Sequence, residues 1–340
     1  MKRHARRLLI PGLLVGLLVV VLVAALLDRA EAADDDSVDA TRVSRIGDLR
    51  IAESSGLAVS REHDDLAYTI NDSGNAPVVY AVKVSTGAVV GLTTIRHDTY
   101  TLLDPEALAL RDGTLWVADT GDNGRRRDDV ALFALDEPGP GDHTARPTRY
   151  PVRYEDVPQD VEGLAVPPDG GRMLLLSKGP AGGRVYELPK RLREGRENVA
   201  TRTERDTPPF TSDATYTDDG HHVLVRNYLF AQVRDADSWD LVRTDLLPQQ
   251  PLGETIAIEP SGRSYLVGSE GARSALWRIE LKLGDPADPA PAPSESVPPA
   301  DSRVEVTDAG PPWVPIAGVG AAVAVLVLVI VLVRRRARRS

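Results

Sequence analysis

Glu162-Gly-Leu-Ala-Val166 is one of five related stretches that decide how this 340-residue chain folds. Each stretch consists of a small or acidic residue and a short, mostly apolar run, and the other four are Ser55-Gly-Leu-Ala-Val59, Glu106-Ala-Leu-Ala-Leu110, Asp213-Ala-Thr-Tyr-Thr217 and Glu254-Thr-Ile-Ala-Ile258. The intervals between successive stretches are 51, 56, 51 and 41 residues. A repeat of this length, built from short strands rather than helices, is typical of the blades of a β-propeller.

Within each repeat, short apolar runs alternate with turn signals, and the first repeat predicts four strands at residues 56–60, 66–70, 78–84 and 88–95. The last repeat lacks a fourth run, whereas residues 41–51 precede the first repeat and belong to none. We therefore predict an all-β, five-bladed propeller over residues 41–283, with the N-terminal strand completing the last blade and removing an exposed sheet edge. Six blades are the alternative, if residues 189–211 hold a further one.

Both ends of the chain predict an association with the membrane. Residues 1–32 combine a basic start, an apolar run and small residues, as in a signal peptide that is either cleaved or kept as an N-terminal helix. Residues 284–312 are rich in proline and predict an extended stalk. Residues 313–333 predict a transmembrane helix, and the basic residues 334–340 a cytoplasmic tail. These features predict a single-pass plasma-membrane protein with an extracellular propeller.

The composition narrows the classes of chemistry and of partner. The chain has no cysteine, which excludes disulfides, thiol nucleophiles and cysteine-ligated zinc. Ten of the 40 Lys and Arg residues lie in the two terminal clusters and at Arg29, and two of the 50 Asp and Glu residues precede Ala33, so the remainder carries a charge of −18. So acidic a surface disfavours nucleic acid. It serves either solubility or the attraction of metal ions and cationic partners.

The repeat also predicts where function is located. In a propeller blade, the innermost strand begins and the second strand ends on the same face, so the residues at these points are expected to meet in a central funnel. They are Glu106, Glu162, Asp213 and Glu254 at the strand starts, and Asp72, Asp119, Lys178, Arg226 and Glu270 at the strand ends. Closely packed carboxylates need a counter-charge, either a divalent cation or Lys178 and Arg226. In the alternative interpretation, the carboxylates accept hydrogen bonds from the backbone of the next blade and bind no ligand.

Three stretches of the chain resemble a known superfamily. The stretches Ile51–Ser60, Asp104–Leu110 and Leu115–Asn123 are similar to bacterial, actinobacterial-type exported propellers of the phytase-like, gluconolactonase-like and NHL-like superfamily, and the resemblance extends over nearly all of residues 41–283. In lactonase-like members, a Glu at the start of an inner strand holds calcium together with Asn and Asp from other blades. The resemblance therefore implies Glu106, Glu162 and Glu254 as calcium ligands, and oxygen ligands suit that ion. It identifies no catalytic base.

Two functions fit these observations. The first is a binding or scaffold protein, tethered to the plasma membrane, that meets a protein or cell-envelope ligand at the funnel. The second is a calcium-dependent hydrolase of phosphoesters or lactones. No nucleophile elbow, phosphate-binding loop or zinc-protease motif occurs in the sequence, which favours the first. The charges at the funnel distinguish the two, because carboxylates neutralised by Lys178 and Arg226 alone indicate binding or a structural role.

Overall fold

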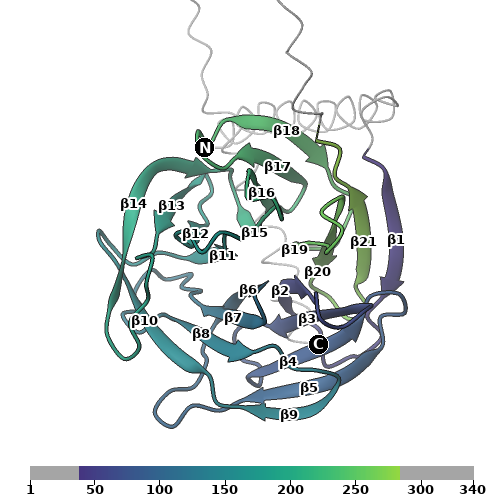
Figure 1. The fold of residues 1–340 in the computed structure, drawn as a ribbon, viewed down its shortest axis with the longest axis horizontal. Helices are drawn as coiled ribbons and strands as arrows, with labels where there is room; N and C mark the ends of the chain where they lie inside the picture. Colours follow the sequence, from purple (N-terminus) through teal and green to yellow (C-terminus); the bar gives the residue numbers. More distant parts are fainter. Residues whose placement is uncertain (1–37, 284–340) are drawn as a thin grey trace, which may run out of the picture. The chain divides into compact units, whose positions relative to one another are not determined.

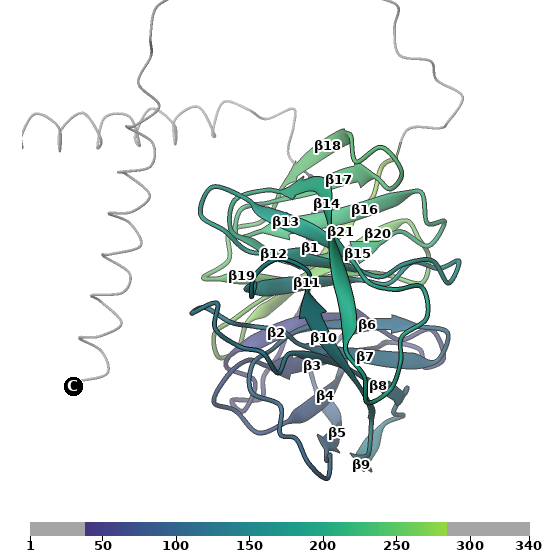
Figure 2. The same ribbon diagram turned by 90° about the vertical axis from the view of Figure 1, so that its left-hand side faces the viewer.

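The computed structural model describes residues 38–283, which form twenty-one β-strands and no helix. The strands are arranged as sheets around a common centre (Figure 1), and in the perpendicular view they are stacked above one another (Figure 2). The predicted all-β, propeller-like architecture is confirmed. No helix within these residues is long and apolar enough to cross a membrane. The predicted segments at 1–32 and 284–340 lie outside the described residues.

Twenty of the strands form five groups, each with four neighbouring strands that pair antiparallel. From the centre outward, the groups are β2 (Ser54–Val59), β3 (Leu66–Asn71), β4 (Val78–Lys83) and β5 (Val89–Ile95); β6 (Pro105–Arg111), β7 (Thr114–Asp119), β8 (Ala131–Asp136) and β10 (Thr148–Tyr154); β11 (Val161–Ala165), β12 (Leu174–Ser177), β13 (Gly183–Glu187) and β14 (Asn198–Thr207); β15 (Thr211–Tyr216), β16 (His222–Asn227), β17 (Phe230–Asp235) and β18 (Leu241–Leu246); and β19 (Gly253–Ile258), β20 (Ser264–Ser269), β21 (Ala275–Glu280) and β1 (Ala40–Arg45). The groups follow the predicted repeats.

The last group takes its outer strand from the beginning of the described chain. Strand β1 pairs antiparallel with β21, with Thr41 opposite Arg278. The segment before the first repeat thus supplies the strand that the last repeat lacks, as predicted. This pairing covers the edge of β21 and joins the two ends of the domain.

Two pairings were not predicted. Strand β9 (Gly141–Ala145) runs parallel to β5 and adds a fifth strand to the first group. Strands β10 and β14 also run parallel, which joins two groups into one eight-stranded sheet. Residues 189–210 contain one strand, β14, and β15 begins at Thr211.

The innermost strands close a ring. Contacts run from β2 to β6, β11, β15 and β19 and back to β2. The approach of β2 to β6 depends on Gly56, which has a φ of +85°. A Cβ atom at Gly56 would lie 2.5 Å from the backbone nitrogen of Leu108. Only glycine combines this conformation with this close contact, so the second residue of the repeated stretch is fixed here by packing.

Candidate functional site

Each innermost strand begins with a β-bulge that leaves a residue without a direct partner on the second strand. In β6, Pro105 lies opposite Asp119 and Ala107 opposite Ala118, so Glu106 is the extra residue. The residues in the bulges, called the bulge positions below, are Ser55 (followed by Gly56), Glu106, Glu162, Ser212 and Glu254. Bulges redirect side chains and recur beside functional sites. Here they bring three glutamates to equivalent places at one end of the ring, which we call the entry end.

The residues that directly follow the second strands lie beside the bulges. These post-strand positions are Asp72, Thr120, Lys178, Tyr228 and Glu270. Three of them donate a backbone hydrogen bond to the carbonyl group two residues before the bulge, in the pairs Asp72–Glu53 (3.0 Å), Lys178–Asp160 (2.8 Å) and Glu270–Leu252 (2.9 Å). The repeated bond fixes the post-strand residue against the start of the inner strand. Lys178 is the one cationic residue among these five positions.

Lys178 forms an ion pair with the bulge residue of its own group. Its Nζ lies 2.9 Å from Glu162 Oε1, and the Lys178 side chain is 20% exposed whereas that of Glu162 is 3% exposed. Nζ also lies 5.5 Å from the centre of the Tyr228 ring. Burial acts to lower the pKa of Lys178, but the attraction of Glu162 and Glu254 outweighs it and the net shift is upward. Lys178 therefore keeps its charge.

The carboxyl groups around Lys178, if all were ionised, would carry more negative charge than one ammonium can neutralise. Burial raises the pKa of Glu162 to about 7, even though Lys178 acts in the opposite direction. Burial also raises the pKa of Glu254 well above its usual value, with Glu162 and Glu270 adding to the shift. Glu254 Oε2 is buried and has no hydrogen-bond partner among the described residues. We conclude that some of these carboxyl groups hold protons at neutral pH.

Glu106 belongs to a second carboxyl pair, with Asp104. Glu106 accepts a hydrogen bond of 2.8 Å from Ser55 Oγ, and burial, followed by the charges of Glu162 and Asp104, raises its pKa well above the usual value. Gly121 makes room for the pair. A Cβ atom at this glycine would lie 2.4 Å from Glu106 Oε1 and 2.5 Å from Asp104 Oδ2. A side chain at position 121 would therefore displace at least one of the two carboxyl groups.

Asp72 and Glu270 complete the acidic surface of the entry end. Burial raises the pKa of Asp72 to about 8, and the charges of Glu53 and Glu270 contribute to the shift. Asp72 Oδ1 is buried without a hydrogen-bond partner within residues 38–283. Since Asp72 and Glu270 are only partly buried, this side of the site is open to solvent.

Asp213 does not belong to this cluster. Ser212 occupies the bulge of β15, so the repeated stretch that contains Asp213 is displaced by one residue from the other four. Asp213 is fully buried and accepts hydrogen bonds from the backbone nitrogen atoms of Ala214 (2.8 Å) and Ile256 (2.9 Å). It joins β15 to β19. For Asp213, the alternative interpretation, a carboxylate that holds the backbone of the next blade, is correct.

Arg226 and Asp119 are likewise occupied by structural contacts. Arg226 is fully buried, and its NH1 donates to the carbonyl oxygens of Thr255 (2.8 Å) and Gly268 (3.0 Å). Asp119 is fully buried and accepts hydrogen bonds from Tyr100, Leu103, Asp104 and Arg127. Neither group is available to a ligand. Arg226 lies one position before the end of β16, and its guanidinium lies at the start of β19, where a Cβ atom at Gly253 would be 2.0 Å from its NH2 and where its charge acts on Glu254.

The expected calcium ligands do not form a metal site in this structure. Across residues 38–283, no group of three or more His, Asp or Glu side chains has the geometry to hold a metal ion. Glu162 is paired with the Lys178 ammonium, and Glu106 is bound to Ser55. The calcium ligand set of Glu106, Glu162 and Glu254 therefore stays a prediction, and the structure adds that Lys178 supplies a positive charge beside Glu162.

Three participants were missed in the sequence, although all three leave a signal there. Asp104 and Asp160 each stand two residues before a bulge glutamate, in Asp104-Pro-Glu106 and Asp160-Val-Glu162. An Asp-x-Glu pattern at the blade start would have identified them. Tyr228 occupies the position that is equivalent to Lys178 in the next repeat, so aligning the strand ends would have identified it.

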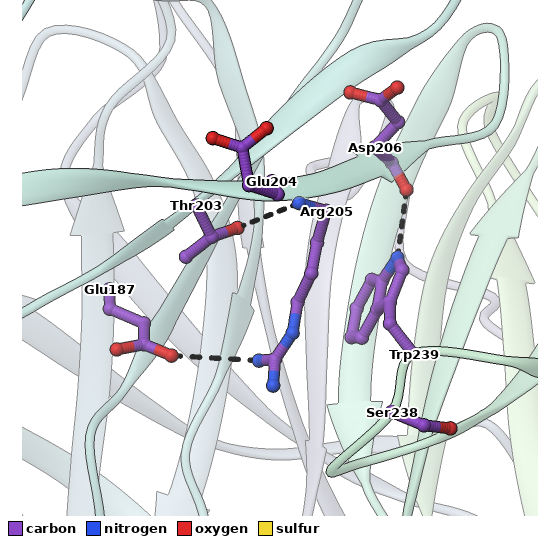
Figure 3. A pocket seen from close by; sticks show the side chains of 7 residues that line it. All are labelled: Glu187, Thr203, Glu204, Arg205, Asp206, Ser238 and Trp239. Atoms are coloured by element: carbon purple, nitrogen blue, oxygen red, sulfur yellow. Dashed lines mark hydrogen bonds and ion pairs between the residues drawn. The ribbon is translucent and has the colours of Figure 1, made fainter.

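A separate cavity of about 450 Å³ lies between β14 and the turn before β18, away from these carboxylates. Figure 3 shows Arg205 between Glu187 and Trp239, and Arg205 NH1 lies 3.6 Å from Glu187 Oε1. Trp239 Nε1 donates a hydrogen bond of 2.9 Å to the carbonyl oxygen of Asp206. These polar groups satisfy one another, so we place the candidate site at the entry end.

The opposite end of the innermost strands, the exit end, has a different construction. A cavity of about 20 Å³, with room for about one water molecule, is lined by inner-strand residues such as Leu57, Leu108 and Ile258. Arg61 forms an ion pair with Asp218, and Arg111 NH1 lies 3.6 Å from the same carboxylate. The three side chains link different groups of strands across this end.

Among known proteins, the chain has similarities of fold but no match in sequence. No protein-family model and no curated protein matches the chain. Among solved structures, the chain is similar to a gluconolactonase from Xanthomonas campestris, with 13% identity, 73% of this chain and 88% of that chain covered, and a TM-score of 0.43. It is also similar to a luciferin-regenerating enzyme (10% identity, 72% and 95% covered, TM-score 0.45) and to the hydrazine synthase of Kuenenia stuttgartiensis (15% identity, 64% and 56% covered, TM-score 0.35).

Proposed function

We propose that the chain is a hydrolase that acts on lactones or related esters at the entry end. The observation that carries this proposal is the partly exposed Lys178 ammonium, 2.9 Å from the buried Glu162 carboxylate and surrounded by further carboxyl groups. Ester hydrolysis needs a base that activates water and a donor that stabilises the charge developing on the carbonyl oxygen. Glu162 and Lys178 supply one of each.

The two residues have distinct roles in this proposal. With a pKa of about 7, Glu162 is partly ionised at neutral pH and accepts a proton from water. Lys178 faces the substrate and binds the developing oxyanion through its N–H donors. Glu254, also buried nearby, keeps Lys178 charged. No step requires a metal ion, so neutralisation by Lys178, which we expected to indicate binding or a structural role, is also compatible with hydrolysis.

The surrounding charge selects among the substrate classes considered for this superfamily. Besides Glu162, the acidic groups Asp72, Asp104, Glu106 and Glu254 act on the same region, and they outnumber the cations that oppose them, which are Lys178, Arg127 and Arg226. A phosphoester carries negative charge and is repelled by such a cluster. A lactone is neutral and is not. The resemblance to lactonase-like propellers supports the same choice.

We also propose a five-bladed propeller displayed outside the plasma membrane. The five groups of strands and the cyclic contacts of their innermost members support the blade number. The apolar segment 313–333 and the basic tail 334–340 support a tether with the propeller outside. Protease treatment of intact cells is expected to remove the propeller and leave the tail protected. Protection of the propeller would contradict this arrangement.

Hydrolysis of a panel of lactones, carboxylic esters and phosphoesters by the full-length protein tests the function. We expect turnover of lactones that Lys178→Met and Glu162→Gln each reduce by at least about a hundredfold, the usual effect of removing an oxyanion donor or a general base. The matched control is Lys83→Met, because Lys83 is exposed on β4 and its replacement changes the net charge equally.

The non-enzymatic alternative, a binding module, predicts a different result in the same experiment. It predicts no turnover of any substrate, whereas a protein or cell-envelope ligand still binds at the entry end. Turnover that is unaffected by Lys178→Met would also reject the proposed site. Neither result would alter the fold.

A further inference from the structure

The charge arrangement around Lys178 is that of a cation bound by protein oxygen atoms. The ammonium lies 2.9 Å from Glu162 Oε1 and 5.5 Å from the centre of the Tyr228 ring. The side chain enters from the post-strand position of its group, where other groups have Asp72, Thr120, Tyr228 and Glu270. The cation is therefore part of the chain and is held in place by the end of β12.

The acidic groups nearby outnumber the two cations that act on Glu254, which are Lys178 and the buried Arg226. Glu254 is 5% exposed, and its Oε2 has no hydrogen-bond partner among the described residues. Glu106, 6% exposed, satisfies one oxygen through Ser55 and directs the other toward Gly121. A divalent cation attracts such oxygen atoms strongly. An ammonium at the same place neutralises only one charge.

We infer that Lys178 is a tethered counter-cation that takes the place of a divalent metal ion at the centre of the entry end, so that the native chain needs no calcium there and acquires a calcium site when the ammonium is removed. This explains why three glutamates at equivalent bulge positions form no metal site. The ammonium is paired with Glu162 and attracted by Glu254, and its loss would leave both carboxylates free to converge on an added ion. The inference does not depend on the proposed hydrolase activity, because its tests measure stability and binding.

Thermal unfolding of the full chain with chelator and then with calcium tests the inference. The midpoint of the native protein is expected to be the same in both. Lys178→Met and Lys178→Gln are expected to gain a calcium-dependent rise of roughly 3–6 °C when calcium exceeds its Kd about tenfold. Isothermal calorimetry with calcium alone should show one added site in these variants.

Three controls separate this site from non-specific effects. Lys83→Met changes the net charge by the same amount at an exposed place and should gain no calcium response. Lys178→Arg keeps the charge and should gain none. Glu254→Gln in the Lys178→Met background removes one oxygen ligand and should abolish the gained response.

Several outcomes would overturn the inference. One is calcium binding by the native chain that Glu254→Gln abolishes. Such binding would show that Lys178 does not occupy the position of the metal ion. Another is a folded Lys178→Met or Lys178→Gln variant without a calcium response. If these variants fold only when calcium is present, the inference is supported. If they do not fold even with calcium, the ion does not replace the lost charge and the inference fails.

Discussion

The entry end and the exit end of the ring are formed by the same five innermost strands, yet their charges are distributed in opposite ways. At the entry end, Lys178 is surrounded by an excess of buried carboxyl groups. At the exit end, Arg61 and Arg111 share the single carboxylate of Asp218. The strand starts thus hold one ammonium among several carboxyl groups, whereas at the strand ends two arginines contact one carboxylate.

This difference indicates that the entry end is a functional site and that the exit end holds the innermost strands together. Carboxyl groups with raised pKa values can exchange protons near neutral pH, and the entry end leaves Glu254 Oε2 without a partner. The exit end encloses only about 20 Å³, and its ion pairs span separate groups of strands. We therefore expect substitutions at the entry end to change chemistry and substitutions at the exit end to change stability.

The largest expected effect is on activity. Lys178→Met should lower kcat/KM for a lactone by about 10²–10³-fold, because it removes the donor to the developing oxyanion. Arg111→Met removes a cation at the other end and should leave kcat/KM unchanged. Steady-state kinetics on both variants checks the comparison. Equal losses in the two would show that the ends are not functionally distinct.

The second effect is on the pH dependence of stability. Glu162 has a pKa of about 7 in the folded protein against 4.5 as its ordinary value, so the folded state binds this proton more tightly than the unfolded state. The resulting stabilisation is complete below about pH 4.5 and is lost as the pH rises through 7; for Glu162 it is roughly 1–3 kcal/mol.

Denaturant unfolding at several pH values checks this expectation. The native protein should lose stability between pH 5 and pH 8, and Glu162→Gln should show a flatter profile, since glutamine does not titrate. Asp72, with a pKa of about 8, should leave a residual slope in the variant. A native stability that rises over this pH range would contradict the buried acidic cluster.

The fold was more predictable from the sequence than the site. The repeated stretch identified all five innermost strands, because apolar residues recur at fixed places after each turn. Strand β9 was missed because Gly141-Asp-His-Thr-Ala145 is largely exposed and has no apolar alternation. Its parallel pairing with β5 is a tertiary contact that local sequence does not encode.

The site was only partly predictable from the sequence. A β-bulge shifts the pairing register between the first and second strands of a group, and the repeated apolar pattern does not show where the bulge falls. In the structure, Glu106, Glu162 and Glu254 occupy equivalent bulge positions, and Lys178 lies beside Glu162. Asp213 looked equivalent, but the bulge in β15 falls on Ser212. A shift of one residue sends a side chain to the other face of a sheet. The buried place of Arg226 follows from the same register, which only the strand pairing reveals.

The third prediction concerns Gly121 and the shape of the entry end. Gly121→Ala would place a Cβ 2.4 Å from Glu106 Oε1, so the Glu106–Asp104 pair must separate. We expect a loss of about 1–3 kcal/mol in unfolding free energy, as for other overpacked sites, together with reduced activity. Gly124→Ala in the same loop is the matched control, because its nearest neighbour would be 3.7 Å away. Denaturant unfolding of both variants should separate them, and similar stabilities would show that the carboxyl pair tolerates displacement.

The smallest expected effect lies at the exit end. Asp218→Asn removes the carboxylate shared by two arginines, of which Arg111 is 11% exposed at its side chain and has a buried Nε without a partner among the described residues. Partly exposed ion pairs contribute about 0.2–1 kcal/mol each, so the loss of two should lower the unfolding midpoint by roughly 1–8 °C, with activity unchanged. Because the loss leaves two like charges facing each other, Arg111→Met should relieve part of it, and the double variant should be more stable than the sum of the single effects predicts. Strictly additive effects would mean that Asp218 does not interact with Arg111, and the ion pair of Asp218 with Arg61 would then account for the charge contact at the exit end.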